Sequence, residues 1–149
     1  MPPSAESPEK DCPFCAIARS EDESVEVIAE AETWLAFFPT APATPGHTLV
    51  IPRRHVPDLW AADPRLAGEL TDAAVQVGRA INVAIEPGGM NLITSAGEAA
   101  EQSVFHLHLH LVPRWSDDAL DIWPPKKTMR REAEKNLGGK IRAALGKST

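Results

Sequence analysis

Polar and apolar residues alternate strictly over residues 106–111, where His106, His108 and His110 are each followed by a leucine. A period of two is typical of a half-buried strand, because successive side chains point to opposite faces. The pattern predicts a strand within residues 102–112, with leucines facing a core and imidazoles facing a wet pocket or a ligand. The alternative is a strand whose histidines are simply solvated. Residues i and i+4 of a strand, such as His106 and His110, are roughly 13 Å apart. One metal ion can therefore bind at most two of these three histidines.

A helical period replaces the alternation over residues 63–86. Asp63 is a suitable helix cap, Pro64 suits the first helical position, and Pro87-Gly88-Gly89 would end the helix. Apolar residues recur at intervals of three and four along the segment, which predicts one buried stripe. The stripe consists of Leu66, Leu70, Ala73, Ala74, Val77, Ile81 and Ile85.

Four further segments complete the expected fold. Residues 25–29, 33–38, 47–52 and 91–95 have strand character, and the three prolines of residues 39–46 exclude a central strand there. Strands followed by one long helix and then more strands indicate an α+β domain with a mostly antiparallel sheet. We expect a disordered tail at residues 1–11, a domain at 12–114, and an extension at 115–149 with a weak helix, 129–145, interrupted by Gly138-Gly139.

Composition narrows the class of partner. The formal net charge of -6 disfavours a general nucleic-acid surface but not a small phosphorylated ligand. No apolar run is long enough to span a membrane, and the first ten residues lack a basic and then apolar signal pattern. We therefore expect a cytoplasmic protein that binds neither nucleic acid nor membrane.

Both cysteines lie in one motif, Cys12-Pro13-Phe14-Cys15. This spacing is typical of half a zinc site, which needs two more ligands that histidines can supply. A redox dithiol usually follows a buried strand, whereas a polar tail precedes this motif, so zinc is favoured. A redox pair and ordinary packing cysteines remain alternatives. Cysteines confined to one motif also argue for a reducing compartment.

The segment from His106 to Val112 fits the pattern His-φ-His-φ-His-φ-φ, where φ is apolar, and so resembles the histidine triad (HIT) family of nucleotide hydrolases and transferases. Residues 45–52 with His55 resemble an earlier strand of the family. Gln102-Ser103 and the Cys12–Cys15 motif resemble its bacterial zinc-carrying branch. The resemblance covers roughly residues 12–114.

The resemblance implies a HIT-like α+β fold with about five antiparallel strands, one long helix and a C-terminal extension. It also implies a homodimer that attacks the α-phosphate of a purine nucleotide or nucleoside phosphate derivative through a covalent nucleotidyl-histidine. Nucleoside phosphoramidates, dinucleoside polyphosphates and adenylyl sulfates are candidate substrates. The alternatives are a low-turnover nucleotide-binding homodimer and a zinc-dependent hydrolase with catalytic metal on His106 and His108.

Carried over residue by residue, the resemblance implies that His108 is the nucleophile, with its second ring nitrogen held by a backbone carbonyl of the same strand. A neutral imidazole is a competent nucleophile near neutral pH. His110 would stand beside the phosphate, and Ser103 and Gln102 would donate hydrogen bonds to phosphate or leaving-group oxygens. His47 would support the triad from the facing strand.

The zinc-bearing relatives imply a structural zinc site made of Cys12, Cys15, His55 and His106. That arrangement takes one triad imidazole and leaves two for catalysis, which respects the limit of two metal-bound histidines set by the strand spacing.

The resemblance also implies a nucleoside pocket in which Phe14, Ile17 and Phe37 sandwich the base. Two positions depart from the family pattern. Pro39 stands where an aspartate usually contacts the ribose, and Ser95 stands where an asparagine often lies near the phosphate. Pro39 has no side-chain hydrogen bond to offer, so ribose recognition must change or weaken.

Overall fold

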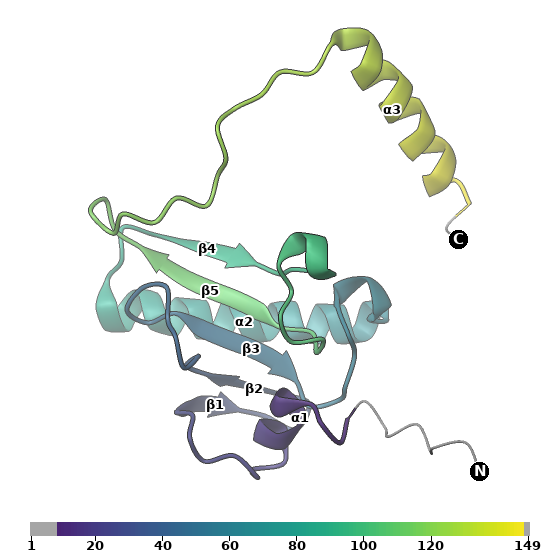
Figure 1. Ribbon diagram of the computed structural model, residues 1–149. Coiled ribbons are helices and arrows are strands. Elements are labelled where there is room, and N and C mark those ends of the chain that lie inside the picture. Colours follow the sequence, from purple (N-terminus) through teal and green to yellow (C-terminus); the bar gives the residue numbers. More distant parts are fainter. Residues whose placement is uncertain (1–8, 148–149) are drawn as a thin grey trace, which may run out of the picture. The chain divides into compact units, whose positions relative to one another are not determined.

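The computed structural model describes residues 9–147. The described residues fall into two compact units, the first ending at Ala119 and the second beginning at Leu120. Residues 1–8 of the expected disordered tail lie outside the described residues. The first unit is built on a five-stranded sheet of order β1-β2-β3-β5-β4 (Figure 1). Every neighbouring pair is antiparallel, which confirms the predicted α+β class.

The strands follow the predicted order along the chain. The ends of β1 to β4 differ from the prediction by at most two residues; β4, for example, begins at Gly89 rather than at Asn91. In the register of the sheet, His110 of β5 is paired with Leu49 of β3 on one side and with Ile93 of β4 on the other. The strands are β1 (Val27–Glu30), β2 (Trp34–Phe37), β3 (Thr48–Pro52), β4 (Gly89–Ile93) and β5 (Leu109–Arg114).

Helix α2 (Pro64–Ile85) covers one face of the sheet (Figure 1). The Asp63 carboxylate caps it by accepting from the Leu66 N–H at 2.8 Å, and Pro64 occupies the first turn, as predicted. Its buried stripe packs on the leucines of the histidine segment, and each such side chain contributes about 1.5–3 kcal/mol when fully buried. This core contains Leu66, Leu70, Ala73, Ala74, Val77, Ile81, Leu107, Leu109 and Leu111.

Helix α1 (Pro13–Ala18) lies on the opposite face. Ile17 of α1 joins Leu35, Phe37, Leu49 and Ile51 in a second buried cluster over β2 and β3. The Cys12 sulfur caps the helix by accepting from the Cys15 N–H at 3.5 Å. The cysteine motif is thereby fixed against the face of the sheet that carries the imidazoles.

The predicted strand over residues 102–112 is wrong in its first half, because β5 begins only at Leu109. Side chains and a loop take the hydrogen bonds that a ladder would use. The Leu107 N–H donates to the Val56 carbonyl at 2.6 Å, and the His106 carbonyl accepts from the His108 ring at 2.7 Å. The Thr94 hydroxyl donates to the His108 carbonyl at 2.9 Å. The side chains of residues 106–111 still point alternately to opposite sides, with the three leucines in the core.

The second unit contains helix α3 (Arg131–Leu145), whose residues are almost all exposed. The predicted interruption at Gly138-Gly139 is wrong, since the helix continues through both glycines. Two short 3-10 turns, η1 (Leu59–Ala61) and η2 (Glu98–Ala100), belong to the first unit. Within residues 9–147 no helix combines the length and apolar character needed to cross a bilayer.

Candidate active site and metal cluster

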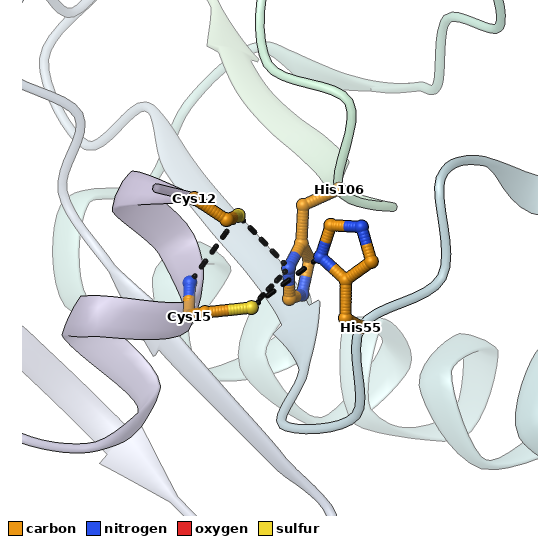
Figure 2. A group of neighbouring side chains, drawn as sticks. All are labelled: Cys12, Cys15, His55 and His106. Atoms are coloured by element: carbon orange, nitrogen blue, oxygen red, sulfur yellow. Dashed lines mark hydrogen bonds between the residues drawn. The ribbon is translucent and has the colours of Figure 1, made fainter. Parts of the chain in front are cut away.

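Four side chains from three parts of the first unit converge on one point. Cys12 and Cys15 come from the start of α1, His55 from the turn after β3, and His106 from the segment before β5 (Figure 2). One ligand atom from each lies within 4.8 Å of all the others. The structure thus brings together all four predicted metal ligands.

The spacing of these atoms fits a tetrahedral metal ion. Bonds of about 2.0–2.3 Å imply ligand-to-ligand distances of about 3.3–3.8 Å. The Cys15 sulfur lies 3.3 Å from His55 Nδ1 and 3.5 Å from His106 Nδ1, and the Cys12 sulfur lies 3.5 Å from the same His106 nitrogen (Figure 2). The cluster can therefore hold a metal ion with two thiolates and two imidazoles.

The surroundings of His106 suit a ligand. Its Nε2–H donates to the Pro52 carbonyl at 2.8 Å, which leaves Nδ1 with the lone pair that faces the cysteines. Burial lowers the pKa of His106 to about 4, so the ring is neutral at pH 7. Burial also raises the pKa of the Cys15 thiol to about 11, so a thiolate there needs a nearby cation.

His108 has the opposite tautomer. Its Nδ1–H donates to the His106 carbonyl at 2.7 Å, so Nε2 carries the lone pair. Among the described residues Nε2 has no hydrogen-bond partner, and His108 lines an open cleft. Burial lowers the pKa of the ring, which keeps it neutral at pH 7. A neutral imidazole with one nitrogen held and the other directed at a cleft is arranged as a nucleophile.

A chain of hydrogen bonds fixes the tautomer of His110. The Ala43 N–H, which can only donate, gives its hydrogen to His47 Nδ1 at 2.9 Å. His47 must then carry its proton on Nε2, and this group donates to His110 Nδ1 at 2.9 Å. The proton of His110 therefore lies on Nε2. His110 lines the same cleft, beside His108, with ring centroids 4.9 Å apart.

Burial keeps this pair of imidazoles neutral as well. It lowers the pKa of His47, and it lowers the pKa of His110 to about 4, helped by the positive charges that His108 and His47 would carry. Two neutral rings let His47 donate to His110 without charge repulsion. His110 can thus act as a hydrogen-bond donor towards a ligand in the cleft.

The cleft itself has a volume of about 380 Å³. Phe14 stands at its edge, with its ring 5.5 Å from that of Phe37 and 5.2 Å from that of His108. Of the predicted site residues, the cleft collects His108, His110, His47, Ser103, Phe14, Ile17 and Phe37, and Pro39 lines it too. Among its described lining residues none is lysine or arginine, and Asp22 carries the formal charge.

Gln102 and Ser95 do not line this cleft. Gln102 is buried, and its amide oxygen accepts from the Gly97 N–H at 2.8 Å. Its amide nitrogen donates to the Pro57 carbonyl at 2.6 Å and to the Val104 carbonyl at 3.2 Å. Both ends of the amide thus brace the loop before His106. Ser95 is half-buried after the end of β4.

A family comparison agrees with this geometry. The model of the HIT domain matches residues 20–117. The chain belongs to the HIT family. It is 40% identical to the protein hit of Bacillus subtilis over 106 residues, which is 71% of this chain and 72% of that protein.

Two further HIT relatives bear on the site. A crystal structure of a Zn-bound histidine triad family protein from Mycobacterium smegmatis is 34% identical, with a TM-score of 0.70 over 95% of this chain and 99% of that one. The adenylylsulfatase HINT3 of Arabidopsis thaliana is 32% identical over 127 residues, covering 85% of this chain and 62% of that protein.

Sequence reasoning missed three of the groups that position the histidine segment and its imidazoles in this HIT domain. They are the Pro52 carbonyl, the Ala43 N–H and the Thr94 hydroxyl. Two of the three are backbone groups, which no side-chain pattern marks. The backbone carbonyl that holds the second nitrogen of His108 was expected from the family resemblance, and it is that of His106.

Proposed function

We propose that this HIT protein is a nucleotide hydrolase or nucleotidyl transferase that acts at the α-phosphate of nucleoside phosphate derivatives. The observation that supports the proposal is the lone pair of His108 Nε2, directed at a cleft while Nδ1–H is held by the His106 carbonyl. The adjacent His110 Nε2–H and the Ser103 hydroxyl are the donors for the phosphate oxygens. Such donors stabilise the charge of a phosphoryl transition state.

The reaction proceeds in two displacements. His108 Nε2 forms a bond to phosphorus while the bond to the leaving group breaks, and the leaving group departs with that electron pair and takes a proton from solvent. The resulting imidazolium keeps its Nδ1–H on the His106 carbonyl. Water then attacks phosphorus, the N–P bond breaks, and its electron pair returns to Nε2. The products are the nucleoside monophosphate and the protonated leaving group.

The apolar part of the cleft is the proposed base site. Phe14, Ile17 and Phe37 offer it a flat aromatic edge and an aliphatic surface, which suits a purine ring. With no lysine or arginine among the described lining residues, base stacking and the phosphate donors carry the affinity.

We further propose that the metal is zinc and that its role is structural. Two sulfurs and two imidazole nitrogens are the donor set that zinc prefers, and a four-ligand set leaves no open position for a reactant. Bound zinc would cross-link α1 to the sheet through Cys12 and Cys15. His108 lies outside the four-residue cluster, which argues against a catalytic metal shared by His106 and His108.

A second candidate function, nucleotide binding with little turnover, is favoured by Pro39. This residue lines the cleft and has no side-chain donor or acceptor for a ribose hydroxyl. Calorimetry with AMP beside a turnover assay separates the two functions. Tight AMP binding without product release from any phosphoramidate would support the binder.

The direct test of the enzyme is incubation with AMP phosphoramidate. We expect release of AMP and a transient acid-labile AMP adduct that peptide mass spectrometry places on His108. Metal analysis of the same sample should give about one zinc per chain, since one four-ligand site is formed. An adduct on another residue would refute the assigned nucleophile.

A further inference from the structure

One charged residue of the cleft has no part in the function proposed so far. Asp22 lines the same cleft as His108, and none of the described lining residues is lysine or arginine. A carboxylate without a cation repels the phosphate of a nucleotide, because two negative charges are placed in one confined space. A phosphorylated ligand of this cleft must therefore carry groups that compensate the carboxylate of Asp22.

Asp22 belongs to a short turn beside the apolar part of the cleft. The turn follows α1, where the Ser20 N–H donates to the Ile17 carbonyl at 3.0 Å. Three residues after Asp22, Val25 packs against the buried cluster that contains Ile17 and Phe37. Ile17 and Val25 both line the cleft. The turn that carries Asp22 is thus anchored at each end by a residue of the proposed base site.

The carboxylate of Asp22 is oriented by the chain and can still accept further hydrogen bonds. Its Oδ1 accepts from the Ser24 N–H at 2.9 Å. Hydrogen bonds from the side chain and the N–H of Ser24 lower the pKa of Asp22, so it is ionised at pH 7. The nearby Arg19 pairs with Glu21 at 2.8 Å instead. A carboxylate has about four lone-pair sites, so Asp22 keeps acceptor sites for a ligand.

We propose that Asp22 selects guanine over adenine by accepting hydrogen bonds from the edge of a base held against Phe14, Ile17 and Phe37. The proposal rests on the proposed function at His108 and names the base of its substrate. Guanine presents two adjacent donors, N1–H and N2–H, which match the two oxygens of a carboxylate. Adenine presents its N6–H donor beside the N1 acceptor, and N1 would face a carboxylate oxygen with no hydrogen between them.

The two parts of the cleft then have opposite hydrogen-bonding character. His110 Nε2–H and the Ser103 hydroxyl are donors for the phosphate, whereas Asp22 is an acceptor for the base. A guanine nucleotide has the matching groups, which are acceptor oxygens on its phosphate and N–H donors on its base. Asp22 is half-buried, so solvent screens its remaining repulsion of the phosphate. The preferred substrate class is therefore a guanosine 5′-phosphate derivative.

The test compares the phosphoramidates of GMP, IMP and AMP at equal pH and salt. Hypoxanthine, the base of IMP, keeps the N1–H of guanine but lacks its 2-amino group, so it separates the two hydrogen bonds. We expect kcat/KM to decrease from GMP to IMP to AMP derivatives, with about tenfold or more between the first and the last, because hydrogen bonds to a charged acceptor are strong. Equal values, or a preference for the AMP derivative, would overturn the proposal.

A substitution at Asp22 tests the carboxylate with almost unchanged shape. Asp22→Asn offers one acceptor and one donor, which suits the N6–H and N1 of adenine better than the two donors of guanine. We expect the ratio of kcat/KM for the GMP derivative to that for the AMP derivative to fall by about tenfold or more. An unchanged ratio would overturn the proposal.

Glu23→Gln is the matched control for the charge. Glu23 is exposed one residue away and does not line the cleft. Its substitution removes the same charge from the same turn and should leave the ratio unchanged. Melting temperatures of both variants verify that they fold.

Other roles of Asp22 would give a different result. If the carboxylate held the ribose hydroxyls, or acted only through its charge, Asp22→Asn would change kcat/KM for all three substrates by the same factor. That outcome would overturn selection of the base while leaving the nucleophile intact.

Binding provides a readout that needs no turnover. Calorimetry should give tighter binding of GMP than of AMP to the parent protein, and Asp22→Asn should abolish the difference. Equal affinities of the parent protein for GMP and AMP would overturn the proposal. The expected binding difference without release of nucleotide from any phosphoramidate would refute the proposed function and retain Asp22 as the residue that selects the base.

Discussion

The row of histidines contains two regions that share one residue type and differ in which ring nitrogen is held. At the metal cluster, His106 gives its Nε2–H to the Pro52 carbonyl and offers Nδ1. At the cleft, His108 gives its Nδ1–H to the His106 carbonyl and offers Nε2. One ring faces a closed group of four ligands and the other faces open space. The difference shows that backbone acceptors, not the imidazoles themselves, determine which ring nitrogen is offered to the metal cluster and which to the cleft.

Replacing one histidine at a time tests whether the two rings have separate roles. We expect His108→Ala to lower kcat for AMP phosphoramidate by several powers of ten, because the covalent route is lost. Its melting temperature should stay close to that of the parent protein. His106→Ala should do the reverse, lowering the melting temperature strongly while its folded fraction keeps measurable turnover. Comparable activity loss with no melting change in both variants would mean that the two rings have no separate roles.

Removal of the metal tests the role of the cluster of Cys12, Cys15, His55 and His106 alone. Chelation should lower the free energy of unfolding by several kcal/mol, because binding energy at a structural site is folding energy. Thermal unfolding with and without chelator measures this. The Cys15→Ser variant is the control, since its already weakened site should respond much less to chelator. An unchanged unfolding curve after verified metal loss would contradict a structural role.

The hydrogen-bond chain from Ala43 to His110 gives a smaller expected effect. His47→Ala removes the donor that fixes the tautomer of His110, and loss of one such hydrogen bond of about 1–1.5 kcal/mol corresponds to roughly a tenfold lower kcat/KM. His47→Gln offers an amide N–H in its place and should recover part of the loss. Steady-state kinetics at pH 7 measure both variants. Identical losses in the two would show that the ring, and not its donor, is what matters.

The pH dependence of stability tests the burial of the cleft imidazoles. An unfolded histidine binds a proton near pH 6.5, whereas burial holds the pKa of folded His110 at about 4. Between these values the unfolded state binds more protons, so the free energy of unfolding should fall as the pH decreases from about 6.5 to about 4. His110→Gln should show a shallower slope in denaturant titrations at several pH values. A slope equal to that of the parent would mean that His110 titrates normally in the folded protein.

Much of the fold could be predicted from local pattern. The alternation around His106–Leu111, most of the stripe of α2, and the cap at Asp63 each depend on neighbouring residues, and the structure confirms them. The prediction was wrong for Ile85, which is exposed at the end of the helix. The errors have non-local causes. The histidine segment joins the sheet only at Leu109, because Val56 and the His108 side chain take the hydrogen bonds that a longer strand would use.

In the site, too, some features could be predicted from local pattern and others could not. Residue types and order indicated which side chains would carry the proposed chemistry, and the structure brings the four cluster ligands and most of the cleft residues together. A backbone carbonyl on the second nitrogen of His108 was expected from the family resemblance and is found two residues away, at His106. The tautomers of His106, His47 and His110 could not be predicted, since they depend on groups positioned by tertiary contacts. The bracing role of Gln102 was hidden for the same reason, because its partners Gly97 and Pro57 lie in separate turns.

A single residue, His106, links the two regions. Its ring lies against the cysteines, and its carbonyl accepts a hydrogen bond from the His108 ring. Evolution can replace the ring but cannot delete the carbonyl, which every amino acid possesses. A sequence change that removed the thiols, and with them the proposed ion, would therefore leave in place the carbonyl that orients the His108 ring. A shift of the main chain at this position would disturb the proposed nucleophile and the proposed metal site together.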